Sequence, residues 1–248
     1  MNGHGHGHGH GHGHGHGHGH GHGHGHGHGD GHGHGGAPQG LFVVIEGIDG
    51  AGTTTQAERY AARLRARNRD AHVTREPSTG PVGALIRQIL TGAIHLPDAK
   101  RAETMALLFA ADRIHHVEHE ITPALAAGHV VLSDRFDLSS LAYQSATSTG
   151  GERAATLAWI RELNRHARRP DITLVLNVRP TVAAERRRAR GSGRELYDDA
   201  DLQAELAAAY RRAEDLVPGD RLVHIDGEAP PEIVTEAIAA AVDPLLGT

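Results

Sequence analysis

Glycine and threonine residues between positions 47 and 54 form a pattern that could bind phosphate. Gly47, Gly52 and Thr54 fit the motif G-x-x-x-x-G-K-[ST], in which backbone N–H groups cradle phosphates and the hydroxyl holds Mg²⁺. Thr53 stands where that motif has its lysine. The pattern therefore predicts anion binding by backbone amides and a helix N-terminus, without the charge of a lysine. An ordinary glycine-rich turn between a strand and a helix would explain these residues equally well.

A second segment suited to phosphate chemistry ends an apolar run further along the chain. Asp134 follows the residues Val-Val-Leu-Ser at 130–133, and Arg135 comes next. A carboxylate at the end of a strand beside a phosphate loop can hold Mg²⁺ directly or through water. The planar guanidinium of Arg135 suits phosphate oxygens. An alternative of equal weight is that Asp134 caps the next helix and Arg135 pairs with it.

Apolar, β-branched runs alternate with amphipathic segments rich in Ala, Leu, Arg and Glu after residue 40. This alternation is typical of right-handed βαβ units, so we expect one α/β domain with a five-stranded parallel sheet flanked by helices. Functional residues in such sheets gather at the carboxyl ends of the strands. The predicted strands are Leu41–Glu46, Ala71–Arg75, His129–Asp134, Ile172–Val178 and Arg221–Ile225.

Charge and composition exclude several classes of protein. The formal net charge is −5, and outside an arginine cluster at residues 186–194 there is no strongly basic run, so a nucleic-acid partner is not indicated. The absence of cysteine excludes disulfides and thiolate catalysis, and it fits a reducing compartment. No apolar stretch approaches the length of a membrane span, and no signal peptide is recognisable. We expect a cytoplasmic protein with small-molecule partners and no membrane contact.

The first residues of the chain are a glycine–histidine repeat. Residues 3–36 alternate these two residue types except at Asp30 and at a closing Gly-Gly. With no apolar side chain to bury, residues 1–37 are predicted to be a disordered tail that precedes a domain at residues 38–248. The imidazoles could bind Ni²⁺, Zn²⁺ or Cu²⁺, or become cationic below about pH 6.5. Alternatively, the tail is a repeat or a purification segment, and we expect no role for it in the main activity.

Several motifs after the tail occur together in one order and spacing. They are Phe42–Gly52, Thr74–Pro77, Ile86–Arg87, Leu107–Arg113, Ser133–Gln144 and Pro170–Thr173. In these segments the sequence resembles thymidylate kinases, P-loop enzymes that phosphorylate dTMP. The resemblance covers nearly the whole chain after the tail, and it implies a P-loop kinase fold.

The resemblance implies a role for each residue that matches a family motif. The acceptor dTMP would be bound at its 3′-hydroxyl by Asp49, at its phosphate by Arg75 and Arg135, and at its sugar by Tyr143. Its base would be stacked on Phe109 and hydrogen-bonded by Arg113, Ser140 and Gln144. Mg²⁺ would be held by Thr54 and Asp134. ATP would be bound by Gly47, Ile48, Asp49, Gly50, Ala51, Gly52, Thr53 and Thr54.

Without the resemblance, two of these residues have simpler interpretations. Phe109 lies on a predicted helix of Leu and Ala, so it would be assigned to the hydrophobic core. Tyr143 could equally be a half-buried packing residue.

The sequence departs from the family pattern in three places. Thr53 replaces the lysine, Ser78-Thr79-Gly80 replaces Gly-Gly-Thr, and Asn177 stands where Asp is common. The arginine cluster leads into Gly-Ser-Gly at 191–193, a composition typical of a lid that closes over phosphates. We therefore expect a lid at about residues 186–199, with Arg190 or Arg194 supplying the missing cation. For most of the cluster, an exposed helix face with partners such as Glu185 is the preferred interpretation.

The resemblance implies the reaction ATP + dTMP → ADP + dTDP, a step towards dTTP, catalysed with Mg²⁺ by a homodimer. Catalysis would involve Asp49, Arg135 and the lid arginines. One alternative is a nucleotide-binding regulatory protein that lost catalysis with the lysine. A kinase for another nucleoside monophosphate is a second alternative, and a metal-sequestering protein that uses the tail is a third.

Overall fold

The structure is a computed structural model that describes residues 40–147, 153–191, 197 and 199–247. The chain divides into two units, Met1–Gly35 and Gly36–Thr248, and every described residue belongs to the second. The predicted tail at residues 1–37 and the predicted Arg194 therefore lie outside the described residues.

The five predicted strands form one parallel sheet with the order β2-β3-β1-β4-β5. This confirms the predicted α/β architecture. The first two strands have the predicted bounds, and each of the others differs by one residue at one or both ends, as strand ends commonly do. The strands are β1 (Leu41–Glu46), β2 (Ala71–Arg75), β3 (Val130–Asp134), β4 (Ile172–Asn177) and β5 (Leu222–Asp226).

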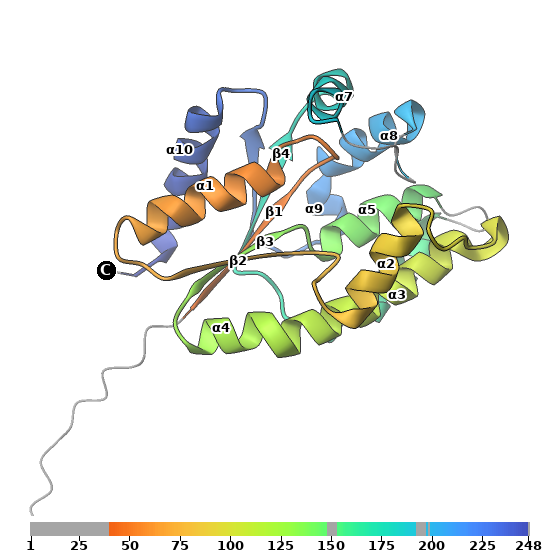
Figure 1. Cartoon of the computed structure of the whole chain (residues 1–248), viewed down its shortest axis with the longest axis horizontal. Coiled ribbons are helices and arrows are strands. Elements are labelled where there is room, and N and C mark those ends of the chain that lie inside the picture. The colour runs from red at the N-terminus through yellow and green to blue at the C-terminus, as the bar shows by residue number, and fades with distance from the viewer. Residues whose placement is uncertain (1–39, 148–152, 192–196, 198, 248) are drawn as a thin grey trace, which may run out of the picture. The chain divides into compact units, whose positions relative to one another are not determined.

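Helices cover both faces of the sheet, with α1 and α10 together on one face and α4 on the other (Figure 1). A π-helical turn, Val117–Ile121, joins α3 to α4. The helices are α1 (Thr53–Arg65), α2 (Pro81–Leu90), α3 (Arg101–His116), α4 (Thr122–Ala126), α5 (Asp137–Thr147), α6 (Arg153–Leu163), α7 (Pro180–Ala189), α8 (Ala200–Tyr210), α9 (Ala213–Leu216) and α10 (Pro231–Val242).

Alternate side chains of β1 enter the two halves of the core. Val43 and Ile45 pack with apolar residues of α1, whereas Phe42 and Val44 pack with the π-helical turn and α4. Because both faces of a parallel sheet are covered, the strand reads as a continuous apolar run rather than as alternating polar and apolar residues. Because β1 is buried up to its last residue, Glu46, the glycine-rich turn begins at a fixed place at the end of the strand.

The strand order brings the carboxyl ends of β1, β3 and β2 next to one another. Ile45 is in register with Asp134, which is in register with Arg75. The glycine-rich turn after β1 therefore meets the polar end of β3. This is the edge at which the sequence predicts the site.

Candidate active site

The turn from β1 into α1 has the backbone geometry of a phosphate-binding loop. Gly50 and Gly52 have φ angles of +93° and +98°, a region that favours glycine. A Cβ on Gly50 would lie 2.4 Å from the carbonyl oxygen of Ala183, so packing against α7 also requires glycine there. Helix α1 begins at Thr53 with no side-chain cap and no acidic residue in its first turn. Its N-terminal N–H groups and its dipole can therefore receive an anion.

Thr54 and Asp134 meet beside this loop. The Thr54 hydroxyl donates a hydrogen bond to Oδ2 of Asp134. Among the described residues, the other carboxylate oxygen, Oδ1, is buried and has no hydrogen-bond partner. A hydroxyl beside an incompletely satisfied carboxylate fits Mg²⁺, which prefers oxygen ligands and usually takes only one or two carboxylates. No group of three His, Cys, Asp or Glu side chains within the described ranges could hold a metal, so phosphate and water would complete such a site.

Asp49 of the loop forms an ion pair with Arg135, which follows β3. Nη2 of Arg135 donates to Oδ1 of Asp49 at 2.6 Å, and the Tyr143 hydroxyl donates to Oδ2 at 3.1 Å. The Arg135 guanidinium also lies 5.3 Å from the centre of the Tyr143 ring. The structure thus brings Asp49, Arg135 and Tyr143 together, as the resemblance implies.

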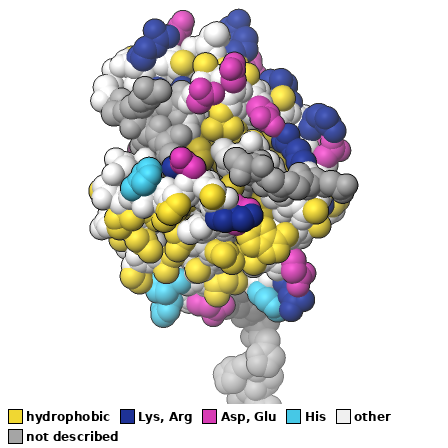
Figure 2. Space-filling model, turned by 90° about the vertical axis from the view of Figure 1, so that its right-hand side faces the viewer, with side chains coloured by type: hydrophobic (Ala, Val, Ile, Leu, Met, Phe, Trp, Pro, Cys, Tyr) yellow, Lys and Arg dark blue, Asp and Glu magenta, His cyan; other side chains and the backbone are white. Residues whose placement is uncertain are grey.

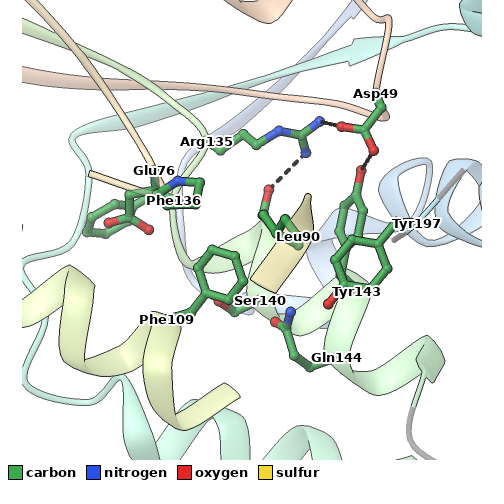
Figure 3. A pocket seen from close by; sticks show the side chains of 12 residues that line it. Asp49, Glu76, Leu90, Phe109, Arg135, Phe136, Ser140, Tyr143, Gln144 and Tyr197 are labelled. Carbon is green, nitrogen blue, oxygen red and sulfur yellow. Dashed lines mark hydrogen bonds and ion pairs between the residues drawn. The ribbon is translucent and has the colours of Figure 1, made fainter. Parts of the chain in front are cut away.

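A cleft opens from this ion pair towards α3 and α5 (Figure 3). Phe109 supplies an aromatic face, and Ser140 and Gln144 present polar side chains beside it. Among the described residues, Oε1 of Gln144 is buried and lacks a hydrogen-bond partner, so it can accept from a ligand. The lining residues are Asp49, Glu76, Pro77, Leu90, Phe109, Arg135, Phe136, Ser139, Ser140, Tyr143, Gln144 and Tyr197.

Arg75 and Arg113 are not among the residues that line this cleft. Arg75 is an exposed residue at the end of β2. Arg113 is buried, and its guanidinium donates to Glu76 at 2.5 Å, to Asn164 at 2.5 Å and to Ser140 at 3.1 Å. Arg113 therefore lies behind Ser140 and supports the wall of the cleft. Its predicted contact with the base and the predicted contact of Arg75 with phosphate stay predictions.

The comparisons with known proteins agree with this geometry. A sequence profile described as thymidylate kinase matches residues 45–238. The chain belongs to the thymidylate kinase family. It is 38% identical over 211 residues to a "Probable thymidylate kinase" of Thermococcus kodakarensis, covering 84% of this chain and 99% of the relative. It is 40% identical over 206 residues to a "Thymidylate kinase" of Thermomicrobium roseum, covering 81% and 93%. A "Thymidylate kinase" of a Jannaschia species is 38% identical over 206 residues, covering 82% and 95%.

Membership of the thymidylate kinase family makes the protein a kinase, with a nucleoside triphosphate as phosphate donor. It also assigns the glycine-rich turn to a P-loop rather than to an ordinary turn between a strand and a helix. Within the described part of the chain, no helix is long and apolar enough to cross a bilayer.

Arginines of α7 contact the loop that lacks the lysine. Nη1 of Arg186 donates to the carbonyl oxygens of Ala51 at 3.3 Å and Gly227 at 2.9 Å. Arg187 donates to the carbonyl oxygen of Asp49. Arg190, the predicted source of the cation, is an exposed residue at the end of this helix. Positive charge from α7 therefore reaches the P-loop through Arg186 and Arg187. The predicted role of Arg190 stays a prediction, and Arg194 lies outside the described residues.

Tyr197, which lines the cleft, and Gln203, which contacts Asp49, were not predicted from the sequence. The Tyr197 ring lies 5.1 Å from the Tyr143 ring in an edge-on arrangement, and its hydroxyl hydrogen-bonds with Gln144. Nε2 of Gln203 on α8 lies 3.4 Å from Oδ2 of Asp49. Burial raises the pKa of Tyr197 to about 12, so its hydroxyl stays protonated at neutral pH. No local motif marks these residues, because Gln203 on α8 and Tyr197 shortly before it reach the site where α8 packs against α5.

The surface on the side of α2, α3 and α8 is mixed in charge (Figure 2). Acidic and basic side chains alternate across its upper part, and hydrophobic side chains gather lower down. Exposed apolar residues of α2 and α3 include Leu85, Leu107 and Ile114.

Proposed function

We propose that the protein transfers the γ-phosphoryl group of ATP to dTMP, giving ADP and dTDP. The observation that carries this proposal is the Asp49–Arg135 ion pair. It joins the P-loop to the aromatic cleft, so a donor phosphate on one side and an acceptor nucleotide on the other would meet at Arg135.

Each part of the site has a task in this reaction. The amides of the P-loop and the N-terminus of α1 would hold the donor phosphates. Arg135 would bind the acceptor phosphate, an oxygen of which attacks the γ-phosphorus while the bond to the oxygen that bridges the β- and γ-phosphorus breaks. Asp49 would orient Arg135 and accept a hydrogen bond from the acceptor's 3′-hydroxyl. Catalysis then consists of positioning and charge stabilisation, because phosphoryl transfer needs little covalent help from the protein.

Thr54 and Asp134 would hold Mg²⁺ in this reaction. The ion would supply positive charge to neutralise the donor phosphates. The buried Oδ1 of Asp134, which has no partner among the described residues, supports this assignment.

The cleft is suited to a pyrimidine base. Phe109 offers a face for stacking, Gln144 an amide, and Ser140 a hydroxyl. A ligand that cannot hydrogen-bond these polar groups leaves them unpaired in the cleft. The free-energy cost of the unpaired groups discriminates strongly against such a ligand. Tyr143 beside the sugar would disfavour a 2′-hydroxyl, and Arg113 would fix Ser140.

The acceptor preference tests this proposal. dTMP should be phosphorylated with a kcat/KM at least about tenfold higher than CMP or GMP, because only its base matches the stack and the polar pair. A coupled assay of ADP release with dTMP, dUMP, CMP and GMP measures this. Equal rates with all four acceptors would contradict the thymidylate assignment but would leave a kinase.

We also propose that the glycine–histidine tail is separable from catalysis. Removing residues 1–36 should abolish tight Ni²⁺ or Zn²⁺ binding yet change kcat by less than about twofold, because a segment without apolar side chains adds little to a packed site. Metal titration and steady-state kinetics of the truncated protein check both statements. A large loss of kcat would show that the tail takes part in the reaction.

We further propose that the protein acts as a homodimer in the cytoplasm, with small-molecule nucleotides as its partners and without binding nucleic acid or membranes. Exposed apolar side chains on α2 and α3, namely Leu85, Leu107 and Ile114, support a protein–protein contact there. The net charge of −5 and the mixed charges of Figure 2 support the absence of a polyanionic partner.

A further inference from the structure

Glu46 is a buried carboxylate that the reaction described above does not use. It is the last residue of β1, directly before the P-loop, and its side chain is inaccessible to solvent. Its oxygens accept hydrogen bonds from the start of α5 and from α8. Oε1 accepts from the backbone N–H groups of Phe136 at 2.8 Å and Ser139 at 3.2 Å. Oε2 accepts from the hydroxyls of Ser139 at 2.6 Å and Tyr210 at 3.0 Å.

The same two hydroxyls contact Arg135. Nη1 of Arg135 donates to Oγ of Ser139 at 3.2 Å and to the Tyr210 hydroxyl at 3.3 Å. A hydroxyl that donates to a carboxylate directs its lone pairs elsewhere, and here they face the guanidinium. The two hydroxyls also lie 2.9 Å from each other, so each proton has a second acceptor available. An ionised Glu46 attracts both protons and thereby leaves the lone pairs of Ser139 and Tyr210 to accept from Arg135.

The backbone at Arg135 needs such support. Its φ of +72° is in the left-handed region, which is uncommon for a residue with a side chain. Three hydrogen bonds hold this turn: Arg135 N–H to Ile45 O at 2.9 Å, Ser133 Oγ to Arg135 O at 2.7 Å, and the Phe136 N–H to Glu46. Glu46 thus accepts from the backbone N–H of Phe136, next to Arg135. It also accepts from the two hydroxyls that the Arg135 guanidinium contacts.

We propose that Glu46 is a positioning residue for phosphoryl transfer, whose ionised carboxylate sets the Ser139 and Tyr210 hydroxyls to accept from Arg135 and so directs its guanidinium at the acceptor phosphate. The inference rests on the proposed function, because it assigns that task to Arg135.

Protonation of Glu46 would weaken this arrangement, because a carboxylic acid must donate its own proton to one neighbour. Burial raises the pKa of Glu46 to about 7, against the opposing charge of Arg135 and the hydrogen bonds from Ser139, Phe136 and Tyr210. Arg135 and Tyr210 are the titratable groups that face it. The Glu46 carboxylate therefore gains or loses its charge close to neutral pH, whereas Arg135 and Tyr210 do not change charge there.

Glu46→Gln keeps the size of the side chain and removes its charge. At pH 8 we expect kcat with dTMP to fall by about tenfold, and the KM for ATP to change by less than about twofold, because a misdirected catalytic group slows the transfer without removing the donor site. In the parent protein, kcat should fall as the pH is lowered through about 7, and this acid limb should be absent in the variant. Tyr210→Phe, which keeps the carboxylate but removes one acceptor of Arg135, should give a smaller loss and keep the acid limb.

The thermal midpoint separates positioning from a structural role. Because the folded state binds the Glu46 proton more tightly than the unfolded state, the charged carboxylate costs stability above about pH 7 and stops doing so as the pH falls towards 4.5. The thermal midpoint of the variant minus that of the parent should therefore be more positive at pH 8 than at pH 5.5. Glu58→Gln, at an exposed position of α1, is the matched control for both measurements.

Two outcomes would overturn the inference. One is a parental kcat and acid limb in Glu46→Gln. The other is a loss of kcat that parallels a lower thermal midpoint at every pH, which would show only a structural brace. Absence of dTDP with the parent protein would overturn the proposed function and this inference with it, whereas parental activity in the variant overturns the inference alone.

Discussion

Alanine at Arg135 should lower kcat with dTMP by about 10²–10³-fold, the usual effect of removing one preorganised donor from a transition state. The guanidinium lies between Asp49 of the P-loop and the aromatic cleft, so it can contact the acceptor phosphate as charge develops on it. Steady-state kinetics with dTMP and ATP measure the loss.

Arg135→Lys separates charge from geometry. A lysine keeps the positive charge but cannot contact Asp49, Ser139 and phosphate with one planar fork, so its kcat should lie between those of the parent and the alanine variant. Arg168→Ala, at an exposed position away from the cleft, is the matched control and should keep the parental kcat. An alanine variant of Arg135 with more than half of the parental kcat would contradict the role assigned here.

The second large effect concerns the missing lysine. Loss of one preorganised donor corresponds to about 2.7–4 kcal/mol, so Thr53 is tolerable only if another cation serves the transferred phosphoryl group or if the enzyme is slow. The predicted lid at about residues 186–199 would supply it. Alanine at Arg190 or Arg194 should therefore lower kcat by at least about tenfold, with a much smaller effect on the KM for dTMP.

Two further variants show whether the cations share one task. Thr53→Lys should restore kcat in the lid variant more than it accelerates the parent, because the two cations would serve one charge. Arg187→Ala extends the series to the residue whose side chain already contacts the P-loop carbonyl of Asp49. Parental kcat in both the Arg190 and the Arg194 variants would refute the compensation by those residues, and a loss confined to Arg187→Ala would place the cation on α7 itself.

The parts of the site made by short segments follow directly from the sequence. The apolar run of β1 and the glycines after it predict both the strand and the P-loop, because local burial and positive φ angles determine them. The contact of Thr54 with Asp134 follows from the rule that parallel strands end at one edge. The roles of Phe109, Tyr143 and Gln144 were predicted from the resemblance. Without it, Phe109 would be assigned to the hydrophobic core, and Tyr143 could equally be a half-buried packing residue.

Other features depend on packing between distant segments. Gln203 of α8 contacts Asp49 across 154 residues of sequence, and Glu46 accepts a hydrogen bond from Tyr210 of α8 across 164 residues. Arg113 shows a different effect. A buried guanidinium needs a partner of opposite charge, and Glu76 holds it behind Ser140 rather than in the cleft. The spacing of residues in the sequence does not show whether the Arg113 guanidinium pairs with Glu76 or faces the cleft.

We propose that this chain phosphorylates dTMP although Thr53 replaces the P-loop lysine. The most direct measurement is the transfer of radioactive label from γ-labelled ATP to dTMP by the parent protein with Mg²⁺, with the products separated and Arg135→Ala assayed in parallel. The parent should give labelled dTDP and an equal amount of ADP, and the variant should react more slowly by about 10²-fold or more. Binding of both nucleotides by the parent with no labelled dTDP, or equal labelling by the two proteins, would contradict this proposal.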